Sequence, residues 1–224
     1  VQPLISRAAA KRRMIFIELP LLVGRGSYNR PSSSLMLIGN GAGRRRGGRE
    51  DCMSDGSEKP WLRVIQDWHG ALDEKVRPFE ERHVDRLQCR MGCHDCCMDG
   101  ITVFEVEALE IQERCAPLLE QEEPHPPGKC AFLDVVGGCR IYAHRPYVCR
   151  TQGLPLRWVE EEGDEVMEYR DICPLNEEGE ALETLPGEVF WTLGPLEGEL
   201  AQMQAERDGG AMKRVALRDL FKRA

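Results

Sequence analysis

The chain has 224 residues, of which 42% are hydrophobic and 30% charged, a composition typical of one globular domain with extensions or of two small domains. Its formal net charge is −8, although residues 1–50 carry ten Lys or Arg and two acids, so the remainder is strongly acidic. This acidic remainder argues against a nucleic-acid-binding protein, which requires a basic surface, and no apolar run is long enough to span a bilayer.

Residues 1–58 are rich in Arg, Gly and Ser and show no sustained hydrophobic period, so we expect them to form no folded structure. A signal peptide is one interpretation, since basic residues precede a short apolar run, but Glu18 and Pro20 interrupt that run. An organellar transit peptide is a second, because the segment is Arg-rich and poor in acids. We favour a third, in which the protein begins at Met53 and ordinary protein sequence follows.

The first predicted element is a helix over residues 60–88. Its apolar residues recur every three or four positions, and Pro78 is expected to kink or split it, with a second piece over 79–88. A short extended piece at 101–103 then precedes a second predicted helix over 104–119, in which Cys115 occupies a core position. The predicted inward stripe of the first helix is Trp61, Val64, Ile65, Trp68, Leu72 and Val76.

The middle of the chain predicts short hairpins. Two strands flanking the Gly137-Gly138 turn would bring Cys130 close to Cys139, and a short helix beginning at Pro146 would carry Cys149 inward. A second hairpin is expected over 154–171, with its turn at 162–164. Residues 175–224 are predicted to be mostly helical, with a break at Gly209-Gly210.

The cysteines are the most informative feature of the sequence. Four of the ten lie within nine residues at the spacing C-x3-C-x2-C-C, and four more follow at wider intervals. Spacings this tight place thiolates close enough to share a metal, whereas the disulfide framework of a secreted protein has no need of them. We therefore predict metal ligation by Cys89, Cys93, Cys96, Cys97, Cys130, Cys139, Cys149 and Cys173.

Several details of the metal centre stay open. Eight thiolates suffice for two four-thiolate sites, or for one site and a redox pair, and adjacent Cys96 and Cys97 are not expected to bind one mononuclear ion together. Zinc and iron–sulfur clusters use the same ligands, and the single dense run followed by dispersed cysteines mildly favours a cluster. Two histidines, His94 and His144, are second-choice ligands. Four arginines beside the cysteines, Arg90, Arg140, Arg145 and Arg150, are expected to offset thiolate charge.

These motifs resemble a known family. The run Cys89-x3-Cys93-x2-Cys96-Cys97, followed by Cys130-x-Phe132-Leu133, Cys139-Arg140-Ile141-Tyr142 and Arg145-Pro146-x-x-Cys149-Arg150, is similar to the CxxCxxCC-type zinc- or iron-chelating domain of the YkgJ-like cysteine cluster proteins. The first spacing is one residue longer here than in the family's label. The resemblance covers about residues 85–175 and implies that the cysteines are metal ligands. One related group, the flagellin lysine N-methylases, implies methyl transfer as an alternative activity.

The sequence thus leads to a set of expectations. The fold should be a small irregular α+β domain, mostly helical with short hairpins around the cysteine cluster. A metal-binding domain over 60–175 should follow the 1–58 extension, and a helical tail over 176–224 should pack on it. We expect a cytoplasmic protein with an iron–sulfur cluster or zinc in a redox or metal-handling role, without nucleic acid or membrane partners. A protein-modifying methyltransferase and a structural zinc module with a protein partner are the alternatives.

Overall fold

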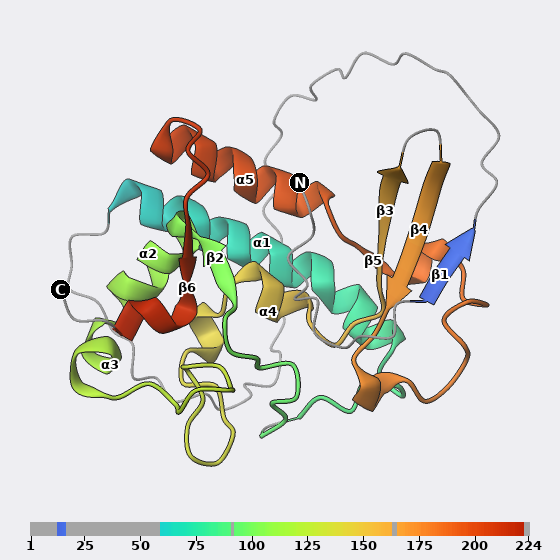
Figure 1. Ribbon diagram of the computed structural model, residues 1–224, viewed down its shortest axis with the longest axis horizontal. Helices are drawn as coiled ribbons and strands as arrows, with labels where there is room; N and C mark the ends of the chain where they lie inside the picture. The colour runs from blue at the N-terminus through green and yellow to red at the C-terminus, as the bar shows by residue number, and fades with distance from the viewer. Residues whose placement is uncertain (1–12, 17–58, 91, 163–164, 222–224) are drawn as a thin grey trace, which may run out of the picture.

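The computed structural model describes residues 13–16, 59–90, 92–162 and 165–221 (Figure 1). Most of the segment predicted to be an extension, including Met53, therefore lies outside the described residues. Its described part, strand β1 (Arg13–Phe16), pairs antiparallel with β4 (Glu165–Asp171). The protein has the mixed α+β architecture that the sequence predicts.

Helix α1 (Pro60–Arg82) confirms the first predicted helix. Pro60 suits the first helical position because proline has no N–H to leave unpaired there. Pro78 lies inside the helix without splitting it, and the helix ends at Arg82 instead of continuing to residue 88. The prediction that Val64 faces inward is wrong, since it is 57% exposed. The buried face of α1 is formed by Leu62, Ile65, His69, Leu72 and Val76.

The second predicted helix is divided in two. Strand β2 (Thr102–Phe104) leads into α2 (Glu105–Arg114), and α3 (Ala116–Gln121) follows after Cys115. Pro117 has no N–H to donate to the preceding turn, which explains why α2 does not run on to residue 119. Cys115 is fully buried, as the sequence predicts for a small core residue.

A four-stranded sheet has the order β1-β4-β3-β5. Strands β3 (Leu156–Glu162) and β4 confirm the predicted second hairpin, and the short strand β5 (Trp191–Thr192) joins β3 in parallel. The first predicted hairpin is reduced to a single bridge between Leu133 and Cys139. Short helices η1 (Tyr142–His144) and α4 (Tyr147–Thr151) connect this bridge to the sheet.

The prediction that residues after 175 are mostly helical is wrong. Helix α5 (Pro195–Asp208) does end at Gly209, as expected, but the rest of this segment consists of short turns and strands. They are η2 (Pro174–Asn176), η3 (Gly187–Val189), β5, β6 (Arg214–Ala216) and η4 (Leu217–Phe221). Strand β6 pairs with β2, so residues far apart in the chain form a second, two-stranded sheet.

Two apolar clusters form most of the core. The first packs α1, α5 and the start of β3, and Figure 1 shows α5 lying alongside α1. The second lies around Phe132 and joins α2, α3 and η4 to the loop that carries Cys130 and Cys139. No helix in the described part of the chain is both long and apolar enough to cross a membrane.

The glycines of α5 provide a test of its C-terminal boundary. Gly209 adopts φ 65°, a left-handed conformation that costs an L-residue about 1–2 kcal/mol, whereas Gly198 lies inside the helix with open space around it. We expect Gly198→Ala to raise the free energy of unfolding by about 0.5–1 kcal/mol and Gly209→Ala to lower it by about 1 kcal/mol. Urea denaturation of both variants measures the difference, and equal effects would contradict the boundary.

Candidate metal centre

The first four predicted ligands lie on a loop shaped by tight turns. The amide of Cys93 donates to the carbonyl of Arg90 at 2.9 Å, and the amide of Cys97 donates to the carbonyl of His94 at 3.0 Å. Two successive turns therefore place four thiols along a short path between α1 and β2. Nδ1 of His94 lies 2.9 Å from the carbonyl of Gly92, so this nitrogen is engaged by the loop itself.

A backbone hydrogen bond joins this loop to the second cysteine segment. The amide of Cys130 donates to the carbonyl of Cys97 at 3.0 Å. Cys139 returns beside Cys130 through the Leu133–Cys139 bridge and a turn in which Asp134 Oδ1 accepts from the amide of Gly138 at 2.7 Å. The predicted proximity of Cys130 to Cys139 is thus confirmed, although regular strands do not form.

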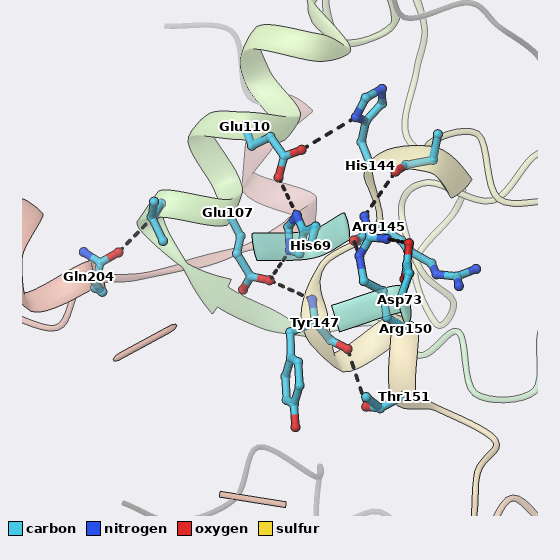
Figure 2. Close-up of polar contacts among 12 residues, drawn as sticks. His69, Asp73, Glu107, Glu110, His144, Arg145, Tyr147, Arg150, Thr151 and Gln204 are labelled. Carbon is cyan, nitrogen blue, oxygen red and sulfur yellow. Dashed lines mark hydrogen bonds and ion pairs between the residues drawn. The ribbon is translucent and has the colours of Figure 1, made fainter. Parts of the chain in front are cut away.

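Cys149 is carried by α4, which is anchored on two sides (Figure 2). The amide of Tyr147, the first residue of α4, donates to Glu107 Oε1 of α2 at 2.7 Å. Arg150 Nη1 donates to Asp73 Oδ2 of α1 at 2.6 Å, and its other nitrogens donate to the carbonyls of Arg145 and Ala143. The predicted short helix is confirmed, with Pro146 as the residue before its first turn.

The predicted ligand cysteines fall into two groups. Cys89, Cys93 and Cys173 influence one another electrostatically and form what we call the first thiol group. Cys130, Cys139 and Cys149 do the same and form the second thiol group. Cys96 acts on members of both groups, and its own side chain is hydrogen-bonded to that of Cys97. The fold therefore gathers all eight cysteines, which come from four separate segments, into one region.

None of these eight thiols forms a disulfide. Burial raises the pKa of the Cys139 thiol to about 11, and that of Cys149 well above its ordinary value. For Cys96 the hydrogen bond with Cys97 is the main cause of a raised pKa, and burial adds to it. Without a cation Cys96, Cys139 and Cys149 are protonated at neutral pH, so that their binding to a metal as thiolates releases protons.

Residues 88–174 match one family model, described as "Putative zinc- or iron-chelating domain" and labelled CxxCxxCC. The match begins one residue before Cys89 and ends one residue after Cys173, and so encloses every predicted ligand. Residues 88–174 are thus similar to this family, and we call the matched segment the CxxCxxCC domain. In the same comparisons no curated protein and no solved structure matches the chain.

The donor chemistry of the CxxCxxCC domain suits zinc or iron, because thiolate sulfur is a preferred ligand of both. As the side chains stand, the described residues include no set of three or more His, Cys, Asp or Glu already grouped to hold an ion. Ligation therefore requires the thiols to turn toward a common point. All eight except Cys149 and Cys139 lie on segments outside helices and the Leu133–Cys139 bridge.

Charge compensation in the CxxCxxCC domain differs in part from the prediction. Arg140 and Arg145 lower the pKa of Cys139, as expected of cations near thiols, although burial outweighs them. Arg150 is instead bonded to Asp73. The sequence did not indicate Arg218 of η4, which also acts on Cys130 and which donates to Asp99 Oδ1 at 2.7 Å and to the carbonyl of Lys129 at 2.8 Å.

The sequence also did not indicate a buried polar cluster that joins three residues of the CxxCxxCC domain to His69 of α1 (Figure 2). His69 of α1 lies between Glu107 and Glu110 of α2: Nε2 is 3.4 Å from Glu107 Oε1, and Nδ1 is 2.8 Å from Glu110 Oε2. The second contact is an ion pair when His69 is protonated. His144, a second-choice ligand, lies 3.7 Å from Glu110 Oε1 and thus belongs to this cluster.

The pKa values within the cluster follow from these contacts. Burial alone would lower the pKa of His69, but the carboxylates of Glu107 and Glu110 outweigh it and raise that pKa above 6.5. Burial would raise the pKa of Glu110, but His144 and His69 lower it to about 2. The shifts favour a protonated His69 beside an ionised Glu110, and Glu107 connects the cluster to the first turn of the helix that carries Cys149.

Proposed function

We propose that the CxxCxxCC domain binds zinc or an iron–sulfur cluster through thiolates of Cys89, Cys93, Cys96, Cys97, Cys130, Cys139, Cys149 and Cys173. One observation carries the proposal: eight thiols that form no disulfide, from four segments of the chain, are gathered in one region. Isolated thiols need no such arrangement. A protein that handles metal, or that transfers electrons through a cluster, does need it.

The two thiol groups support two centres, or one centre of higher nuclearity with Cys96 between its parts. The first thiol group is the more exposed, since Cys89 is exposed and Cys93 and Cys173 are half-buried. The second is deeper, with Cys130 buried against the apolar cluster around Phe132. A centre that is partly open to solvent suits metal exchange or electron transfer better than a purely structural role does.

Metal and acid-labile sulfide analysis of protein purified without oxygen tests the proposal. We expect zinc, or iron with matching sulfide and a visible absorption band, in amounts that fall on Cys139→Ala. Cys115→Ala is the matched control, because Cys115 is buried in the same apolar cluster but lies outside the predicted ligand set. Wild-type protein that remains metal-free after reconstitution with zinc and with iron plus sulfide would refute the proposal.

A further inference from the structure

Two residues outside the cysteine pattern, Asn176 and Gly153, contact the sulfur of Cys89 and fix its position. We call this arrangement the Cys89 seat. Asn176 follows Cys173 by three positions, and its Nδ2 donates to Cys89 Sγ at 3.5 Å and to the carbonyl of Gly153 at 2.8 Å. Its Oδ1 accepts from the amide of Gln88 at 2.8 Å. Asn176 is completely buried, so this side chain is fixed in orientation by partners on both of its polar atoms.

Gly153 forms the other side of the seat. It adopts φ +98°, and a Cβ added there would lie 2.9 Å from Cys89 Sγ and 3.4 Å from Asn176 Nδ2. Real Cβ atoms essentially never approach another atom at 2.9 Å, so glycine is required if the sulfur is to stay where it is. Two independent features therefore act on the same sulfur atom: the buried amide donor of Asn176, and the absence of a Cβ at Gly153.

The seat also connects the two ends of the cysteine pattern. The amide of Asn176 donates to the carbonyl of Cys173 at 2.8 Å, which forms the η2 turn after that cysteine. The same residue therefore bonds the first predicted ligand through its side chain and the last through its backbone. Cys89 and Cys173 are far apart in sequence, and Asn176 is bonded to both.

We propose that Asn176 and Gly153 are positioning residues for metal binding, which seat the Cys89 sulfur beside Cys173 so that both cysteines serve one centre. This inference rests on the proposed function. The physical reason is that an amide N–H donated to a sulfur is stronger when the sulfur carries charge, and a metal-bound thiolate carries it. The amide thus favours the ligating form of Cys89 and holds it in place before the metal arrives.

Zinc release tests the inference. In zinc-loaded protein with an excess of a chromophoric chelator, we expect Asn176→Asp to release zinc about 10- to 100-fold faster than wild type, the range found when outer-shell partners of metal ligands are removed. This substitution keeps the acceptor for Gln88 and removes the donor to Cys89. Gly153→Ala should act in the same direction, because its methyl group displaces the sulfur.

Two matched controls separate positioning from lost stability. Gln204→Glu is also an amide-to-acid change at a completely buried residue, in α5 and bonded to Val106 and Asp208. Gly194→Ala introduces a side chain at φ +113° with open space around it. Both should release zinc at the wild-type rate. In cobalt-substituted protein the sulfur-to-metal absorption band should shift in Asn176→Asp and stay unchanged in Gln204→Glu.

The outcomes distinguish this inference from the proposed function. If wild-type protein binds no zinc, the proposed function fails. If wild type binds zinc and folded Asn176→Asp and Gly153→Ala release it at the wild-type rate, only the inference fails. If neither variant folds, partial alkylation of wild-type zinc-loaded protein decides: joint protection of Cys89 and Cys173 supports the inference. Alkylation of Cys89 as fast as in zinc-free protein overturns it.

Discussion

Replacing His69 by leucine should lower the free energy of unfolding by about 3–5 kcal/mol at neutral pH. The reason is that His69 is 3% exposed and lies between Glu107 and Glu110, which are 3% and 2% exposed. Without His69, Glu107 and Glu110 remain buried and have lost the one side chain that lies between them, although His144 still lies beside Glu110. Urea denaturation of both proteins measures the change.

The pH dependence of this effect follows from the pKa shifts. The lowered pKa of Glu110, about 2 against an ordinary 4.5, gives stability that is complete above pH 4.5 and is lost as pH falls toward 2. The raised pKa of His69 gives stability that is complete below pH 6.5 and is lost as pH rises through the folded-state value. The cluster therefore contributes most between pH 4.5 and pH 6.5.

In His69→Leu, Glu110 keeps His144 but loses His69, so its pKa should rise from the wild-type value and the variant should lose less stability than wild type as the solution is made acidic. The difference from wild type should thus shrink toward acid pH. His83→Leu is the matched control, since His83 is also buried but its Nε2 lies 2.8 Å from the carbonyl of Val189. If the free energy of unfolding of His69→Leu changed with pH in the same way as that of wild type, the cluster would not be charged.

Removing the metal should loosen one part of the protein while the rest stays folded. Where the structure describes them, residues 88–100 and 122–141 contain almost no helix or strand and are held by turns and a few backbone hydrogen bonds. Helices α1 and α5 pack in a separate apolar cluster that contains no cysteine among its buried residues. We expect chelation to abolish amide hydrogen-exchange protection in the two loops and to leave α1 and α5 protected.

The size of the metal's contribution can be measured in the same protein. Zinc present at about a thousandfold excess over its dissociation constant should add about 4 kcal/mol to the stability of the loops by mass action. Exchange rates as a function of free zinc concentration give this value. Complete unfolding on chelation would instead show that the metal is required for the whole fold, as in zinc fingers. Unchanged amide hydrogen exchange in both loops after chelation would show that no metal stabilises them.

Much of the fold could be predicted because local patterns determine it. The periodic apolar residues of α1, the antiparallel pairing of the neighbouring strands β3 and β4, and the glycine that ends α5 each depend on residues close together in the chain. Pro78 misled the prediction because a proline within an amphipathic helix can be tolerated when packing holds both sides. The segment after Cys173 misled it more, since its strands are short and pair with distant partners.

In the candidate site, too, features set by neighbouring residues could be predicted and features set by distant contacts could not. Spacing alone led to the prediction of the cysteine ligands, because tight thiol spacing is rare and chemically specific. Their grouping could not be predicted, since it depends on how loops cross in space. Asn176 bonds to Cys89 across 87 positions, and His69 meets Glu107 across 38. His69 has a detectable signal only in retrospect: it stands on the buried face of α1, where an ionisable residue needs a partner.

The pairing of β2 with β6 has a consequence for biosynthesis. Arg214 contacts Thr102 across 112 positions, and η4, which follows β6, brings Arg218 to the loop before Cys130. A ribosome therefore delivers every predicted ligand cysteine before the segment that completes their surroundings. Nascent thiols would be accessible to cations or oxidants during that interval. Cells that produce this protein under oxidative stress would consequently be expected to accumulate mispaired disulfides in newly made chains rather than in mature ones.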